Sequence, residues 1–279
     1  MLTILESRVK SFGLDVRMGA AIAAEVYLNG ALVSDKAPGQ MVSQSLAIQH
    51  EVVPGRNTLL VIATVAGVSP YSAPRPVTGL DAADCFVELD LETDTVKDIG
   101  DSYQITTEPL KDAHWRAAEA GPQIVLPQRI TLTFEAEGPL APPVWTRGRA
   151  VQAEAVKAEA GIALADLHRL LEHKDLAGFE DRMRLRNEDM ARAYPLSGTA
   201  PERAKRDSTA LAGELAARGA TLAPIDPARL AVRTFADGRI IDVRAPDGHA
   251  PLRILVPGQD AVYLPVSFSM IEGRLAAVR

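Results

Sequence analysis

Four carboxylates recur at every second position in the first half of the chain. Glu88, Asp90, Glu92 and Asp94 alternate with apolar residues and one threonine: Val87, Leu89, Leu91 and Thr93. In a β-strand, this spacing places all four acids on one face. Carboxylate oxygens suit a hard cation such as Ca²⁺, but ladder carboxylates point in parallel and spread over ~20 Å of strand. We therefore expect a solvated face. The alternatives are a cation site and an acidic docking surface for a basic partner.

A second group of residues could form a polar pocket in the other half of the chain. Asn187 falls on an apolar helical stripe with Met183 and Met190. An unsatisfied buried amide there would cost roughly 1–3 kcal/mol. Asn187 should therefore make a structural hydrogen bond or project into a cavity. For the second case, the groups that could share its acid–base chemistry are Arg233, Asp242, Tyr263 and His249.

The sequence lacks the common motifs of metal binding and covalent catalysis. Its five histidines form no H-x-x-x-H or H-E-x-x-H pair, and the single cysteine, Cys85, has no C-x-x-C companion. No G-x-S-x-G, P-loop or G-x-G-x-x-G sequence occurs. We predict no cofactor and no zinc site, and we favour a protein without catalytic activity.

Composition predicts two soluble domains. The 279 residues are 47% hydrophobic, enough for sizeable cores. Residues 1–148 carry 11 Lys and Arg against 18 Asp and Glu, whereas residues 149–279 carry 19 against 18. Because phosphate binding needs a basic surface, we expect no nucleic-acid partner. The sequence has neither a signal-peptide pattern nor ~18 consecutive apolar residues, which predicts a cytoplasmic protein without membrane insertion.

Short apolar runs and turn signals predict a β-sandwich or jelly roll over residues 1–137. Asn29-Gly30, between runs at 22–28 and 31–33, indicates a hairpin because both residues accept positive φ in a type I′ turn. Further strands are expected at 41–53, 58–65, 85–91, 95–106, 114–118 and 124–135. The proline-rich residues 138–148 are predicted to be a linker.

The pattern changes to helices and then to a strand meander over residues 149–279. Helices are expected at 149–171, from Asp175 to Pro195 with Asp175 as the N-cap, and from Pro201 to Gly219. Strands are expected at 231–235, 239–243, 252–256, 262–270 and 275–278. Such an order predicts an α+β domain, with helices packed on one face of an antiparallel sheet.

Two segments of the first half resemble the NG turn and PG-x-N-x-L-x-V pattern of galactose-binding-like jelly rolls. They are Val26-Tyr27-Leu28-Asn29-Gly30 and Val53-Pro54-Gly55-Arg56-Asn57-Thr58-Leu59-Leu60-Val61. The resemblance implies carbohydrate or protein binding without catalysis. A sugar site would need aromatic side chains exposed together on one sheet face, and the candidates are Tyr27, Tyr71, Tyr103 and Trp115.

The second half resembles the NTF2-like α+β cone superfamily. The matching segments are Leu230-Ala231-Val232-Arg233-Thr234-Phe235-Ala236-Asp237-Gly238-Arg239-Ile240 and Leu264-Pro265-Val266-Ser267-Phe268-Ser269-Met270-Ile271-Glu272-Gly273-Arg274-Leu275. That superfamily holds small enzymes as well as proteins without catalytic activity, so the resemblance alone does not choose a function.

These observations favour a non-catalytic protein that binds another protein. By analogy, it would be an accessory or immunity protein of a bacterial secretion or toxin system, and self-association is compatible with it. One alternative is a lyase or isomerase that uses a cone-shaped pocket in the second domain. The other is a carbohydrate-binding module.

Overall fold

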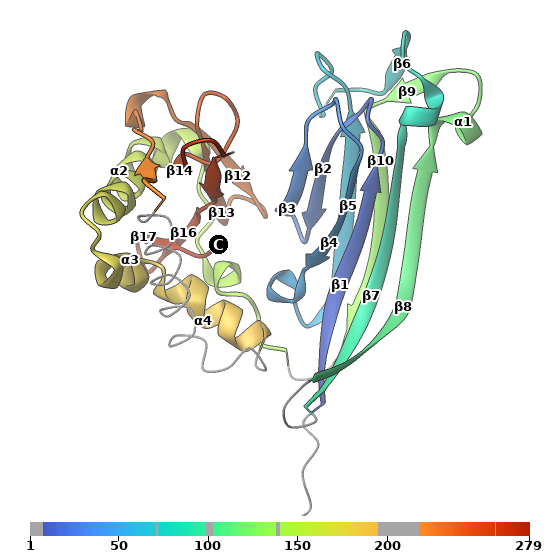
Figure 1. Ribbon diagram of the computed structural model, residues 1–279. Coiled ribbons are helices and arrows are strands. Elements are labelled where there is room, and N and C mark those ends of the chain that lie inside the picture. The colour runs from blue at the N-terminus through green and yellow to red at the C-terminus, as the bar shows by residue number, and fades with distance from the viewer. Residues whose placement is uncertain (1–7, 71, 99–102, 138–139, 195–217, 260) are drawn as a thin grey trace, which may run out of the picture. The chain divides into compact units, whose positions relative to one another are not determined.

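The computed structural model describes residues 8–70, 72–98, 103–137, 140–194, 218–259 and 261–279 (Figure 1). The chain divides into two compact units, Met1–Pro142 (unit 1) and Pro143–Arg279 (unit 2). Strands pair antiparallel throughout the described residues. The prediction of a chain rich in antiparallel strands is therefore confirmed.

Two four-stranded sheets build unit 1. Their orders are β4-β1-β7-β8, here called sheet A, and β10-β5-β2-β3, here called sheet B. The strands of sheet A are β1 (Arg8–Met18), β4 (Val42–Ala47), β7 (Phe86–Asp98) and β8 (Tyr103–Arg116). The strands of sheet B are β2 (Ala23–Leu28), β3 (Ala31–Lys36), β5 (Gly55–Thr64) and β10 (Gln128–Ala136). Short strands β6 (Arg75–Val77) and β9 (Ile124–Leu126) pair separately, and α1 (Ala117–Ala120) follows β8.

The two sheets of unit 1 enclose one hydrophobic core. Residues at alternate positions of each strand point inward, including Leu14 on β1, Leu89 on β7 and Leu28 on β2, all at most 1% exposed. The rings of Phe12 and Phe134 meet across the core with centroids 5.2 Å apart. The opposite face of sheet A is left for polar residues, as the alternation in β7 predicts.

The turn residues act as predicted at the first hairpin. Asn29 and Gly30 have φ values of 52° and 80° and join β2 to β3. Both residues therefore occupy the left-handed region that a type I′ turn requires.

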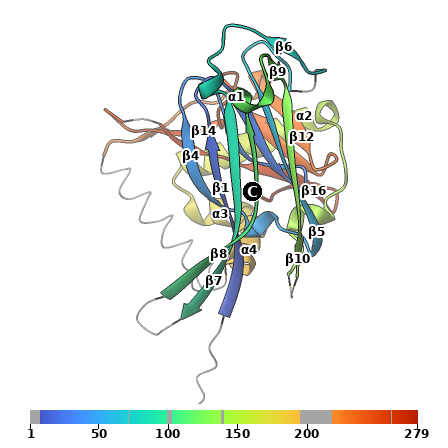
Figure 2. The ribbon, with the colours of Figure 1, turned by 90° about the vertical axis from the view of Figure 1, so that its right-hand side faces the viewer.

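Several strand boundaries in unit 1 differ from the predictions. The expected strand at 95–106 is wrong, because its two ends belong to β7 and β8, which form one long hairpin (Figures 1 and 2). Threonines continue the alternation beyond Leu91, so β7 extends further than its run of apolar residues. The strand expected at 41–53 ends at Ala47 and is followed by a 3₁₀ turn, Gln49–Glu51. The strand expected at 114–118 ends at Arg116, where α1 follows.

Helices precede two sheets in unit 2. The helices are α2 (Ala153–Glu172), α3 (Leu176–Arg182) and α4 (Arg184–Ala193). One sheet has the order β12-β13-β16-β17 and the other β11-β14-β15. The strands are β11 (Thr221–Leu222), β12 (Ala231–Phe235), β13 (Ile240–Arg244), β14 (Leu252–Leu255), β15 (Val262–Leu264), β16 (Ser267–Ile271) and β17 (Arg274–Ala277). Leu164 and Leu167 of α2 pack with Ile241 and Phe268 of the first sheet in one core.

The second predicted helix is divided in two. Asp175 caps α3 as expected, because its carboxylate accepts the Gly178 N–H at 2.9 Å. The helix then breaks at Met183, whose side chain is buried, and α4 begins at the next residue. The strand expected at 262–270 is also divided, because Pro265 separates β15 from β16. The helix expected from Pro201 lies outside the described residues. Within the described part of the chain, no helix is long and apolar enough to cross a membrane.

The end of the predicted linker belongs to unit 2. A 3₁₀ turn, Val144–Arg147, follows the boundary, and the Val144 N–H donates to the Asp189 carboxylate of α4 at 2.5 Å. Beyond it, the Arg149 N–H donates to the Met270 carbonyl at 3.0 Å. These contacts fasten the residues before α2 to the rest of unit 2.

Candidate functional site

The predicted carboxylates of β7 belong to a wider acidic group on the outer face of sheet A. In the strand register, Asp15 of β1 lies directly opposite Asp90, and Asp112 of β8 lies opposite Asp90 on its other side. Glu92 and Asp94 follow on β7, and their side chains share this face. We call Asp15, Asp90, Glu92, Asp94 and Asp112 the acidic surface. Three neighbouring strands thus present a row of three aspartates.

Arginine side chains pair with the carboxylate at one end of this face, Glu88. Glu88, 9% exposed, pairs with Arg17 at 2.7 Å and with Arg116. In the described residues, the five carboxylates of the acidic surface form no ion pair, although Asp94 accepts a hydrogen bond from Thr107 Oγ1 at 2.6 Å. A shallow hollow of about 240 Å³ lies where the two charge types meet, lined partly by Arg17, Glu88, Asp90 and Asp112.

One residue of the acidic surface, Glu92, has a shifted pKa. Burial raises the pKa of Glu92 above its ordinary value of 4.5, and repulsion from Asp15, Asp94 and Asp90 adds to the shift. Both effects disfavour the ionised form of Glu92 at this position.

The acidic surface lacks the convergence that a metal ion needs. Asp15, Asp90 and Asp112 lie side by side across three strands, and Glu92 and Asp94 follow at alternate positions of β7. Side chains on one face of a sheet point in parallel rather than toward one point. Within the described ranges, no three His, Cys, Asp or Glu side chains come close enough to hold a metal ion. The geometry suits a partner with several spaced positive charges better than a single cation.

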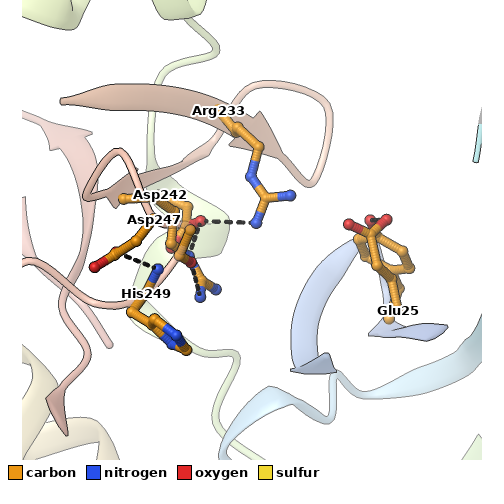
Figure 3. A network of polar contacts seen from close by, with 8 residues as sticks. Glu25, Arg233, Asp242, Asp247 and His249 are labelled. Atoms are coloured by element: carbon orange, nitrogen blue, oxygen red, sulfur yellow. Dashed lines mark hydrogen bonds and ion pairs between the residues drawn. The ribbon is translucent and has the colours of Figure 1, made fainter. Parts of the chain in front are cut away.

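In unit 2, four of the five predicted pocket residues lie in two pairs, Arg233 with Asp242 and His249 with Tyr263. Arg244 links the pairs by donating to the Gly248 carbonyl at 3.3 Å. Figure 3 shows Arg233, Asp242 and His249. Asp242, 8% exposed, accepts hydrogen bonds from Arg244 Nε at 2.8 Å and from Arg233 at 3.2 Å. Neighbouring strands β12 and β13 place Arg233 opposite Asp242. Two guanidinium groups thus contact this one carboxylate.

The other two members lie beyond Arg244. The ring of His249 packs on the ring of Tyr263, with centroids 4.8 Å apart. Asp247 accepts the His249 backbone N–H at 3.1 Å (Figure 3). It also pairs with Arg253 at 2.6 Å. The His249 N–H, followed by Arg253, lowers the pKa of Asp247 below its usual range. These bonds show that Asp247 and His249 stabilise the turn in which they lie.

Asn187 is not part of that group. Its amide donates to Glu180 of α3 at 2.7 Å, and its oxygen accepts from Arg186 at 3.1 Å. Burial lowers the pKa of Arg186, against the opposing effect of Glu180. Asn187 therefore makes the structural hydrogen bond that the sequence allowed, joining α3 to α4.

A larger hollow of unit 2 lies away from all five predicted pocket residues. It measures about 530 Å³ and lies between the outer side of α2 and the 3₁₀ turn Pro227–Arg229. Its lining is mainly apolar, with Ile162 71% exposed, and Glu154 and Lys157 stand at its rim. The contact group around Asp242 does not open into this hollow.

The aromatic residues considered for sugar binding do not form a platform in the described part of unit 1. Tyr27 is 5% exposed and its hydroxyl bonds Glu25, while Trp115 packs against the hydrophobic core. Tyr71 lies outside the described residues, and only the backbone of Tyr103 is described.

Asp15 and Asp112 were missed by sequence reasoning. Asp15 is the single acid of β1, and Asp112 shares β8 with Glu108 alone. The pairing of β1 and β8 with β7 brings both aspartates beside Asp90. The available signal was the alternation in each strand, which places Asp15 between buried Leu14 and Val16. The alternation predicts the face of the sheet on which a residue lies, but not the residue beside it on the neighbouring strand.

Comparisons with protein-family models, curated proteins and solved structures return no match for this chain. The resemblances to galactose-binding-like jelly rolls and to the NTF2-like superfamily stay predictions.

Proposed function

We propose that the protein is a non-catalytic binding protein whose acidic surface docks a basic segment of another protein. The observation that carries the proposal is the row formed by Asp15, Asp90 and Asp112 across three adjacent strands. Like charges directly opposite each other destabilise a sheet. A row of three that forms no ion pair with the described residues costs stability, and a basic partner would recover that cost on binding.

The chemistry of the surface defines the partner. Complementary charges accelerate association and exclude partners of the same sign, and both effects weaken as salt screens the charges. Because the carboxylates stand on paired strands, their spacing is rigid. A protein segment carrying several lysine or arginine side chains fits them.

Within this proposal, unit 1 is a galactose-binding-like module used for protein recognition and unit 2 is an NTF2-like domain. The biological setting we propose, by analogy, is that of an accessory or immunity protein in a bacterial secretion or toxin system. A cytoplasmic location agrees with that setting.

The proposal is tested by affinity capture with a charge-matched control. Full-length protein is immobilised as wild type, as the variant Asp15→Asn/Asp90→Asn/Asp112→Asn, and as the control Glu135→Gln/Glu159→Gln/Glu172→Gln. The control removes the same charge from exposed residues elsewhere. We expect specific proteins captured by the wild type and the control to be lost from the acidic-surface variant. Capture of the same proteins by all three chains would overturn the proposal.

A further inference from the structure

The outermost strand of sheet A has a free edge beside the acidic surface. β8 stands at the end of the order β4-β1-β7-β8 and, among the described residues, pairs with β7 alone. All of its residues from Gln104 to Asp112 are exposed, and the apolar side chain of Ile105 is 63% exposed. An exposed edge of this length can pair with another strand.

The hydrogen-bond pattern shows which backbone groups face that edge. The Ala117 N–H donates to the Cys85 carbonyl at 2.9 Å, so Cys85 faces β8, as does every second residue of β7 after it. The register shifts between Leu91 and Glu92, where Leu110 is an extra residue in β8. Beyond this bulge, Thr93 and Thr95 therefore face Glu108 and Thr106, their register partners. The intervening residues of β8 direct their backbone groups away from β7.

Ile105, Thr107 and Pro109 are those intervening residues. A proline belongs at such a position, because its missing N–H would otherwise remove a ladder hydrogen bond. Ile105 and Thr107 thus offer both an N–H and a carbonyl to the free edge, whereas Pro109 offers a carbonyl. The Lys111 ammonium is bound to the Thr133 carbonyl at 2.6 Å, which directs it toward β10.

The negative charge of the acidic surface favours a basic strand at the free edge of β8. A strand added beside β8 would place alternate side chains on the outer face, next to Asp112 and within reach of Asp94 across Thr107. Pairing of β8 with β8 of a second copy would instead join two acidic surfaces, and like charges would oppose it.

We infer that β8 accepts an added β-strand from a partner protein, supplied by an extended segment with lysine or arginine at alternate positions. This inference rests on the proposed function and names its binding mode. Backbone hydrogen bonds to Ile105 and Thr107 would hold the segment, while its basic side chains contact Asp94 and Asp112.

The experiment uses the full-length protein and two synthetic peptides of identical composition. In the first, lysine alternates with threonine; in the second, the lysines are grouped at one end. Affinity is measured by fluorescence anisotropy for the wild type, Ile105→Pro, Ile105→Thr and Asp15→Asn/Asp90→Asn/Asp112→Asn. Proline removes the edge-facing N–H without removing a bond to β7, and threonine keeps the N–H while shortening the side chain.

We expect the alternating peptide to bind the wild type more tightly than the grouped peptide. Ile105→Pro should weaken that binding about fivefold, the value of one hydrogen bond, and Ile105→Thr should leave it within about twofold. Hydrogen exchange at the Ile105 and Thr107 amides should slow when the alternating peptide binds.

Four results would overturn the inference. One is equal affinity for the two peptides, and another is tight binding without slower exchange at Ile105 and Thr107. If Asp15→Asn/Asp90→Asn/Asp112→Asn weakens binding while Ile105→Pro does not, the proposed function survives and strand addition fails. The fourth is a wild-type dimer, seen by analytical ultracentrifugation and lost in Ile105→Pro, which would make a second copy the occupant.

Discussion

At the scale of single residues, unit 1 contains a polar side chain that is buried completely and fully bonded. Asn57 is 0% exposed, and its oxygen accepts from Asn29 at 2.8 Å and from the Val53 N–H at 2.9 Å. Its amide donates to the carbonyls of Val53 and Gly55, both at 2.8 Å. One side chain thus fixes the turn before β5 and ties it to the β2–β3 hairpin.

Replacing this residue should destabilise the fold strongly. Asn57→Ala removes four hydrogen bonds and leaves the Val53 N–H without its acceptor, so we expect a loss of about 3 kcal/mol in the free energy of unfolding. The control Gln104→Ala, on exposed β8, should change it by less than about 0.5 kcal/mol. Urea unfolding followed by circular dichroism measures both. Equal stability of the two variants would contradict the role of Asn57.

The residue types predicted which side chains make polar contacts better than they predicted which residues those side chains contact. Asn187 was expected to need a hydrogen bond on an apolar stripe, and its amide bonds Glu180. Arg233 and Asp242 were placed in one group and do meet, at 3.2 Å. No sequence pattern names Arg244 as the second partner of Asp242, because side-chain direction depends on the strand pairing around it.

At the scale of elements, the turns of the chain were predictable and the strand ends were not. Asn29-Gly30 produces its hairpin through backbone preferences that belong to those residues alone. The β7–β8 hairpin was divided wrongly, because Thr93 and Thr95 extend β7 with polar β-branched residues. Neighbouring strands in sheet A come from distant parts of the sequence, so the register that builds the acidic surface could not be read from local patterns.

The crowding of carboxylates on sheet A should make stability depend on pH. The folded-state pKa of Glu92 is raised, so its ionised form destabilises the folded protein. That cost is fully present above the raised pKa. It decreases as pH falls through the raised pKa and vanishes below the ordinary carboxyl value of 4.5.

Glu92→Gln should therefore raise the free energy of unfolding at about pH 7 and leave it unchanged at about pH 3. Added salt should reduce the gain at neutral pH by screening the neighbouring aspartates. The control Glu135→Gln removes one exposed charge from β10 and should show neither effect. Chemical unfolding across pH gives the comparison, and a gain that persisted in acid would refute the electrostatic explanation.

At the scale of the whole molecule, the change in sequence pattern coincides with a change in contacts. Strand alternation dominates before the prolines, and helical periodicity follows them. The boundary between the two compact units falls between Pro142 and Pro143 of the chain. Each unit has its own hydrophobic core. The residues just after the boundary lack helical or strand periodicity, and their attachment to unit 2 becomes visible through backbone bonds that no sequence pattern encodes.

Those bonds decide where an independently folding fragment must begin. A fragment of residues 143–279 keeps the Val144 N–H bond to Asp189, the Arg149 bond to Met270 and the bond from Val151 to Gly238 at 2.9 Å. A fragment of residues 152–279 contains all of α2 but loses all three bonds.

We expect residues 143–279 to give one cooperative thermal transition, with the circular dichroism of a folded α+β protein. Residues 152–279 should be less stable by about 3 kcal/mol, roughly 1 kcal/mol for each lost bond. The acceptor Asp189 is also left buried without the N–H it binds, which adds to the loss. An insoluble or molten 143–279 fragment would show that unit 2 needs unit 1 to fold. Equal stability of the two fragments would show that the segment before α2 contributes nothing to unit 2.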